Sequence, residues 1–226
     1  MGAAARDGDR LMATILRDGA TGWPEHVVCS TGPEALAAIL LPHVNLAIWD
    51  RAAMPAVPDA EMLAEIEDIT LMVEAARALP TMTDAMVAAG YPEAFIAPLA
   101  NDIAAHAERL AQLLDRDTLA IRLEVVETDA CRRFHSDYVT ARLILTYAGP
   151  GTQWLDNADA ARLCEGVAAE ALEPRALAPG QIALFKGREW SATGAIVHRS
   201  PPIAGTGQRR LVLVIDPAAD APVPHA

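Results

Sequence analysis

The apolar residues of this chain change their spacing near Asp115. Before that residue they recur every three to four positions, which is typical of amphipathic helices. After it they fall in short stretches rich in β-branched residues, which are typical of strands. Helices followed by several short strands indicate an α+β fold with an antiparallel barrel or jelly roll. We therefore predict a single domain over residues 1–226, in which a mainly helical extension (1–115) packs on a β-barrel core (116–216) and a loose tail follows (217–226).

The helical half contains one expected strand, over residues 45–51. Pro33 is well placed to open a helix over 33–41. Asp59 is expected to cap a long helix that runs to residue 79, where Pro80 stops it. A shorter helix is expected from Thr83 to Gly90, and a further helix over residues 93–114. In the second half the expected strands cover residues 121–127, 139–147, 181–186, 195–198 and 209–215, and one expected helix covers 159–171.

Charge and composition exclude several classes of function. Hydrophobic residues make up 52% of the chain, which is typical of a globular protein. The 30 acidic residues outnumber the 18 basic ones, so we expect neither general nucleic-acid binding nor attachment to an anionic membrane. Three cysteines without CxxC spacing form neither a disulfide framework nor a zinc finger. The N-terminus lacks a signal-peptide pattern and no apolar stretch could span a bilayer, so we expect a cytoplasmic protein.

Two of the six histidines stand in a pattern typical of a metal site. His135 and Asp137 lie two positions apart at the entrance of an expected strand, so both side chains point to the same face. His198 ends another expected strand. Two imidazoles and one carboxylate form the facial triad that holds ferrous iron and leaves coordination positions open. The remaining four histidines have no such partners and are expected to be structural: His26, His43, His106 and His225.

The order of the elements around this pattern resembles the double-stranded β-helix of the iron(II)/2-oxoglutarate-dependent oxygenases. That resemblance covers residues 120–216, and it implies that His135, Asp137 and His198 are both the metal ligands and the catalytic centre. It also implies a basic residue on the last strand that binds the cosubstrate. Arg209 and Arg210 both qualify, although alternate strand residues point to opposite faces and only one can enter the barrel. The spacing from Gly207 favours Arg209, and Arg210 stays open.

Further residues are candidates for the same pocket. Tyr147, and also Tyr138, could hydrogen-bond a carboxylate of the cosubstrate from the strand after the HxD motif. Trp154 and Trp190 could form a wall for the substrate. Cys131 could reach the metal, and a thiolate ligand would suit zinc better than an oxygen-activating iron.

A second resemblance covers most of the chain. The segments CRRFHSDYVTARLILTYAGPGTQWL and VHRSPPIAGTGQRRLVLVIDP resemble an uncharacterised bacterial family, domain of unknown function 1826. This resemblance implies that the fold is a family trait, and it implies no activity. The resemblance to the oxygenases implies an iron(II)- and 2-oxoglutarate-dependent oxygenase of unknown substrate, either a small molecule or a protein. The alternative is a cupin-like zinc- or iron-binding protein without oxygenase activity, for example in metal handling. A homodimer formed through the helical half is left open.

Overall fold

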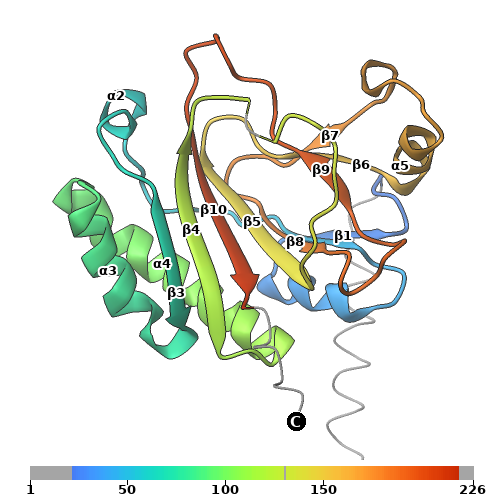
Figure 1. Cartoon of the computed structure of the whole chain (residues 1–226). Helices are drawn as coiled ribbons and strands as arrows, with labels where there is room; N and C mark the ends of the chain where they lie inside the picture. Colours follow the sequence, from blue (N-terminus) through green and yellow to red (C-terminus); the bar gives the residue numbers. More distant parts are fainter. Residues whose placement is uncertain (1–21, 130, 219–226) are drawn as a thin grey trace, which may run out of the picture.

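A large, mostly antiparallel sheet forms the centre of the molecule (Figure 1). The computed structural model describes residues 22–129 and 131–218. The seven strands follow the order β1-β2-β8-β5-β10-β4-β3, and only the β1–β2 pair is parallel. Their bounds are β1 Val27–Ser30, β2 Leu46–Trp49, β3 Ile69–Glu74, β4 Thr118–Val126, β5 Ala141–Ala148, β8 Ile182–Lys186 and β10 Arg210–Pro217.

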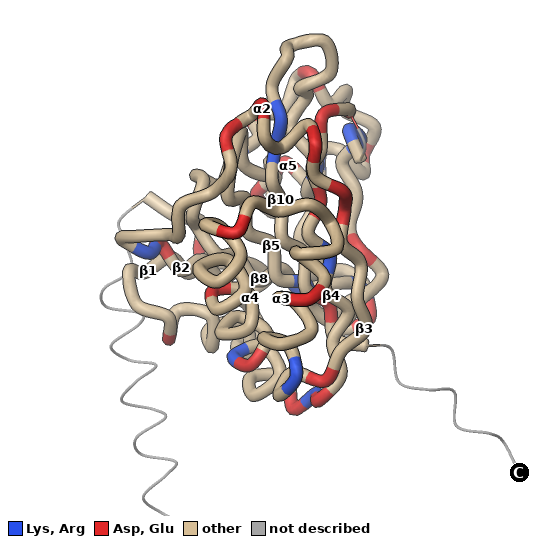
Figure 2. Tube along the Cα trace, turned by 90° about the vertical axis from the view of Figure 1, so that its left-hand side faces the viewer, with Lys and Arg blue, Asp and Glu red and all other residues tan. Residues whose placement is uncertain are grey.

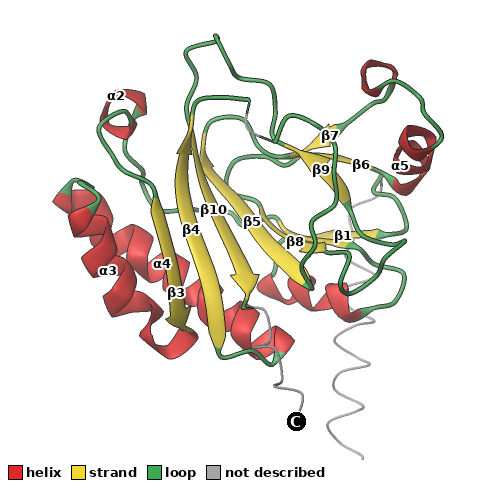
Figure 3. Ribbon diagram, viewed as in Figure 1, coloured by secondary structure: helices red, strands yellow, loops and turns green. Residues whose placement is uncertain are grey.

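A smaller sheet faces one half of the large one (Figure 3). It contains β7 (Arg175–Ala176), β6 (Gln153–Leu155) and β9 (Val197–Arg199) in that order. Apolar side chains from the two sheets, including Ile144 and Trp154, pack together in one buried cluster. The site described below lies on this inner face of the large sheet.

Helices cover the opposite, outer face of the large sheet. Figure 2 looks onto α3 (Ala78–Ala88) and α4 (Glu93–Leu114), with the strands behind them. Both helices bury apolar residues against alternate residues of β4, β5 and β10, and these residues form the largest apolar cluster. The helix predicted over residues 93–114 is confirmed with the same bounds. The shorter elements are η1 Pro33–Leu40, α2 Ala60–Leu63, η2 Ala75–Arg77, α5 Asn157–Cys164 and η3 Ala169–Ala171.

The long helix predicted over residues 59–79 is wrong. Asp59 does cap a helix, through hydrogen bonds to the backbone N–H groups of Glu61 and Met62, but α2 ends after one turn. Residues 69–74 form β3 instead, which pairs antiparallel with β4 at the edge of the sheet. Pro80 lies inside the first turn of α3, where a missing N–H costs little, and therefore does not end a helix. Thr83 is an interior residue of α3 that donates its hydroxyl to the Leu79 carbonyl.

Three strands of the large sheet therefore come from the N-terminal half, and that half is not a helical layer alone. The expected boundary near residue 115 does not separate helices from strands, because β1, β2 and β3 pair within the same sheet as β4, β5, β8 and β10. The expected strands of the second half are confirmed within a few residues, whereas the helix expected over 159–171 divides into α5 and η3. Most of the tail expected over 217–226 lies outside the described residues, as does His225. Within the described ranges, no helix combines the length and apolar character needed to cross a bilayer.

Candidate metal centre

His135, Asp137 and His198 converge on the inner face of the large sheet. The backbones of His135 and His198 pair as an antiparallel bridge, with N···O distances of 3.0 and 2.9 Å, so the segment before β5 lies beside β9. This pairing brings the two imidazole rings to 4.7 Å between centroids. The potential ligand atoms of all three side chains lie within 4.8 Å of one another. The predicted convergence of these residues is thus present in the fold.

The hydrogen bonds around the triad fix which atoms face each other. His135 Nδ1 lies 2.9 Å from the Arg133 carbonyl oxygen, which can only accept, so Nδ1 carries the proton and Nε2 keeps its lone pair. The contact with Asp137 raises the pKa of His135 above its usual value. Burial raises the pKa of Asp137, but its contacts with the two imidazoles outweigh burial and hold that pKa far below its usual range. Asp137 is therefore a carboxylate at neutral pH.

This arrangement fits a divalent metal ion. Asp137 Oδ2 is buried without a hydrogen-bond partner, and it lies 3.1 Å from His198 Nε2. Asp137 Oδ1 lies 3.5 Å from His135 Nε2. Two ligand atoms about 2.1 Å from one ion and at right angles to each other would be about 3.0 Å apart, close to these distances. Two imidazole nitrogens and one carboxylate are the donor set that ferrous iron prefers in oxygenases. This set leaves further coordination positions of the metal open.

A buried arginine lies in the same cavity as the triad. This cavity has a volume of about 130 Å³, and its lining includes His135, Asp137, His198 and Arg210. The Arg210 side chain is 1% exposed. Its guanidinium donates to the Pro150 carbonyl at 2.6 Å and to the hydroxyls of Ser200, Thr146 and Thr152 at 3.1–3.3 Å.

No carboxylate within the described ranges pairs with Arg210. Burial lowers its pKa to about 10, which still leaves the guanidinium charged at neutral pH. A buried cation that only neutral groups solvate is costly, and an anionic ligand would offset that cost.

The model of the family described as protein of unknown function (DUF1826) matches residues 30–216. The chain belongs to this family. The resemblance noted from the sequence is confirmed. No curated protein matches the chain.

Solved structures with similarity to this DUF1826 chain include several oxygenases. A dioxygenase for auxin oxidation from Arabidopsis thaliana, in complex with 2-oxoglutarate, is 13% identical, with 98% of this chain and 82% of that chain covered and a TM-score of 0.45. A prolyl-4-hydroxylase from Pseudomonas putida is 17% identical, with 75% of this chain and 99% of that chain covered and a TM-score of 0.34. The hydroxypropylphosphonic acid epoxidase from S. wedmorenis, in complex with fosfomycin, is 16% identical, with 43% of each chain covered and a TM-score of 0.28.

Of the two candidate arginines in the DUF1826 chain, Arg210 enters the cavity and Arg209 does not. The preference for Arg209 from the Gly207 spacing is therefore wrong. Arg209 points outward, and it donates to Glu127 at 2.9 Å and to the Ala60 carbonyl. β10 begins at Arg210, and its alternation directs Arg210 and Val212 inward and Leu211 toward the helices.

The expectation that Tyr147 faces the pocket is also wrong. Tyr147 belongs to the outward-facing set of β5, packs in the cluster under the helices, and donates its hydroxyl to Asp102 of α4 at 2.7 Å. Tyr138 is 76% exposed. Trp154 is fully buried between the sheets, and Trp190 packs against the helix-side cluster. None of these four residues lines the cavity that holds the triad.

The remaining candidates divide between cavity and core. Cys131 lines the cavity at a solvent-exposed position, but its thiol is not part of the group of ligand atoms formed by the triad. His26 and His106 are buried and partnered, His26 with Asn45 and His106 with Asp102, in agreement with a structural role.

Sequence reasoning missed three charged residues at the site. Arg122 and Glu124 of β4 line the cavity, and Arg142 of β5 lines it and contacts Asp137. An arginine inside a predicted strand is commonly solvent-exposed. Arg142 could have been identified because it alternates with Ile144 and Thr146 at two-residue spacing, which places all three on the same face of the strand.

Proposed function

We propose that this chain is an iron(II)- and 2-oxoglutarate-dependent oxygenase with a double-stranded β-helix core. The observation that carries the proposal is the presence, in one small cavity, of a two-histidine, one-carboxylate triad and of Arg210, a buried arginine without a carboxylate partner among the described residues. The triad alone would suit many metal proteins. The Arg210 guanidinium adds a specific requirement for an anion, because it is desolvated and its hydrogen-bond acceptors within the described ranges are all neutral oxygens.

In this proposal Arg210 binds the distal carboxylate of 2-oxoglutarate. The hydrogen bonds of Arg210 to Pro150 and to three hydroxyls use four of the five guanidinium N–H groups, so one N–H of Nη1 remains for a carboxylate oxygen. A charge-assisted hydrogen bond of this kind is about twice as strong as a neutral one. The hydroxyls of Thr146, Thr152 and Ser200 hold the guanidinium in one orientation. That orientation is fixed before the ligand arrives, so little side-chain entropy is lost on binding.

His135, Asp137 and His198 would hold the metal at the other end of the cavity. The Arg133 carbonyl accepts from Nδ1, so in the neutral His135 imidazole Nε2 is the nitrogen available as a ligand. A ferrous ion held there would supply the redox chemistry of oxygen activation, which no side chain of the chain can supply. The apolar side chains of Ile144, Val212 and Val214 line the space between the two ends and limit its hydration.

The proposal is tested by 2-oxoglutarate turnover with added ferrous iron under air, with and without the wild-type chain. We expect consumption of 2-oxoglutarate that requires iron and that His135→Ala abolishes while the fold is retained, because His135 lies at the rim of the cavity and not in the apolar core. A wild-type chain that binds neither metal nor 2-oxoglutarate would overturn the proposal.

The second candidate is a zinc- or iron-binding protein without oxygenase activity. The observation that favours it is Cys131, whose thiol lies at the cavity that the triad lines. Metal content after purification separates the two candidates: zinc whose affinity falls in Cys131→Ser, together with no binding of 2-oxoglutarate, supports the second.

A further inference from the structure

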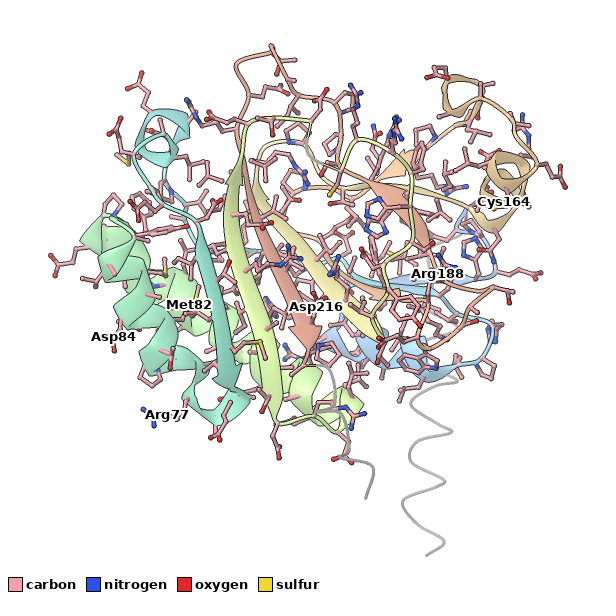
Figure 4. All side chains as sticks on the ribbon, in the orientation of Figure 1. Arg77, Met82, Asp84, Cys164, Arg188 and Asp216 are labelled. Carbon is pink, nitrogen blue, oxygen red and sulfur yellow. The ribbon has the colours of Figure 1, made fainter. Side chains whose placement is uncertain are left out.

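Arg142 links the Asp137 carboxylate to a second buried carboxylate, that of Asp216. Its Nη1 lies 2.7 Å from Asp137 Oδ1 and forms an ion pair with it. Its Nε and Nη2 donate to Asp216 Oδ1 and Oδ2, each at 2.7 Å, in the fork geometry of a bidentate pair. Asp216 lies near the end of β10, where it is labelled in Figure 4.

The three side chains are largely shielded from water. Arg142 is 17% exposed, Asp216 12% and Asp137 13%. Arg142 and Asp216 come from the adjacent strands β5 and β10, so the bidentate pair is supported by the strand pairing itself. Each of its two hydrogen bonds is charge-assisted, and together they fix the plane of the guanidinium. The third nitrogen, Nη1, then lies beside Asp137 Oδ1.

We propose that Arg142 is a positioning residue for the metal ligand Asp137, and that Asp216 balances the charge of Arg142 so that a cation can bind beside it. This inference rests on the proposed metal site. Arg142 occupies Oδ1 of Asp137, while Oδ2 has no hydrogen bond and faces His198. The guanidinium therefore holds the carboxylate in one rotamer and leaves the oxygen nearest His198 available.

The role of Asp216 follows from electrostatics. A guanidinium in contact with a metal ligand places a positive charge within a few ångströms of the ion, and in a partly buried site such repulsion is weakly screened. The bidentate pair with Asp216 cancels that charge locally and keeps the orienting ion pair with Asp137. The second arginine near Asp216, Arg122, lies farther away, at 3.9 Å, and pairs with Glu124. Removal of Asp216 should therefore weaken metal binding chiefly through Arg142.

A double-mutant cycle with Co²⁺ as the probe tests this. The variants are Arg142→Met, Asp216→Asn and the double variant, each titrated with Co²⁺ by absorption without 2-oxoglutarate. Loss of an outer partner of a ligand typically costs 10–100-fold in metal affinity, and we expect a loss in that range for Arg142→Met. Asp216→Asn should also weaken binding. In the Arg142→Met background, Asp216→Asn should change the Kd for Co²⁺ by less than about twofold, because the effect of Asp216 acts through Arg142.

Arg209→Met is the matched control, since Arg209 is also paired with a carboxylate, that of Glu127, but points outward just before β10. It should bind Co²⁺ like the wild type. The Co²⁺ absorption bands at saturation should change in Arg142→Met and not in Arg209→Met, because only the former alters the geometry of a ligand. Arg142→Lys is the second variant in case Arg142→Met does not fold. Lysine can reach one carboxylate but not both, so it should bind Co²⁺ more weakly than the wild type.

The outcomes separate this inference from the proposed function. If the wild type binds Co²⁺ and Arg142→Met and Arg142→Lys bind it equally well with unchanged spectra, the positioning role is overturned and the metal site stands. If Asp216→Asn weakens binding equally in both backgrounds, the charge-balancing role is overturned. If the wild type binds no Co²⁺, the metal site and this inference fall together.

Discussion

Substitution of Arg210 by leucine should remove the preference of the cavity for a ligand with a distal carboxylate. Arg210 is the buried cation of the cavity that also holds the triad, and it has no carboxylate partner among the described residues. Leucine fills part of the space of the arginine side chain with apolar atoms, and it removes the positive charge and every hydrogen bond that the guanidinium donates. The metal ligands make no hydrogen bond to Arg210, so metal binding should be retained.

The expected loss follows from the hydrogen bonds involved. A hydrogen bond to a charged group contributes about 1.5–3 kcal/mol, and truncation of one partner of a buried charge pair costs about 2–5 kcal/mol. Part of the loss is offset, because the variant no longer carries the cost of a desolvated guanidinium in the free protein. We expect a net loss of about 3 kcal/mol in the binding free energy of 2-oxoglutarate, which is roughly a hundredfold in Kd.

Denaturant unfolding in the presence of a divalent metal measures this loss. A ligand at about 100 times its Kd stabilises a protein by about 2.7 kcal/mol, and after a hundredfold rise in Kd the same concentration gives only about 0.4 kcal/mol. The wild type should respond more strongly to 2-oxoglutarate than to 2-oxobutyrate, which lacks the distal carboxylate, and Arg210→Leu should respond equally to both. Arg209→Leu should behave like the wild type. Unchanged discrimination between the two acids in Arg210→Leu would refute the assignment of Arg210.

Three further predictions concern stability and reactivity. Burial raises the pKa of Asp102, but hydrogen bonds from His106 and Arg51 outweigh it and lower that pKa. Asp102→Asn should therefore lower the free energy of unfolding by about 3 kcal/mol above about pH 4. The difference in unfolding free energy from the wild type should shrink as the pH falls below that value, and a difference that does not change with pH would contradict this. Ile103→Ala, in the fully buried face of α4, should cost about 2–5 kcal/mol by chemical denaturation, and a cost below 1 kcal/mol would contradict the packing of α4 on the sheet. Burial raises the pKa of Cys29 to about 11, so under native conditions at pH 8 an alkylating reagent should modify the two exposed cysteines and leave Cys29, as mass spectrometry of the modified peptides can check.

The triad could be predicted from the sequence because its signal is local. His135 and Asp137 share a face through their two-residue spacing, and this spacing holds whatever the rest of the chain does. His198 required only the correct identification of a strand end. Helix α4 was predicted with its exact bounds for a similar reason, since its apolar stripe is long and Asp115 ends it in the left-handed conformation.

The errors arise where a long-range partner decides the conformation. Residues 69–74 carry apolar residues at spacings compatible with a helix, but their backbone pairs with β4, and only that pairing makes them a strand. The choice between Arg209 and Arg210 depended on a shift of one residue, which exchanges the two faces of a strand. Which of the two arginines points inward is set where the turn before β10 contacts the residue after β5, Gly149. The contact is close, since a Cβ at Gly149, which has a φ of +79°, would lie 2.3 Å from the Arg209 carbonyl oxygen. Neither partner is visible in the local sequence.

Strand β5 shows how one stretch of sequence serves both stability and the proposed site. Arg142 and Ile144 line the cavity and Thr146 contacts Arg210 from the same face of the strand, whereas the residues between them pack under the helices. Arg142 supports the metal end and Thr146 supports Arg210, so four residue steps along one strand, about 13 Å, set the separation between the two charged ends of the cavity. The register of β5 is fixed by its outward-facing apolar residues, because a shift by one residue would expose them and bury charges in their place. The apolar core under the helices therefore sets the geometry of the polar cavity on the opposite face, although none of its side chains lines that cavity.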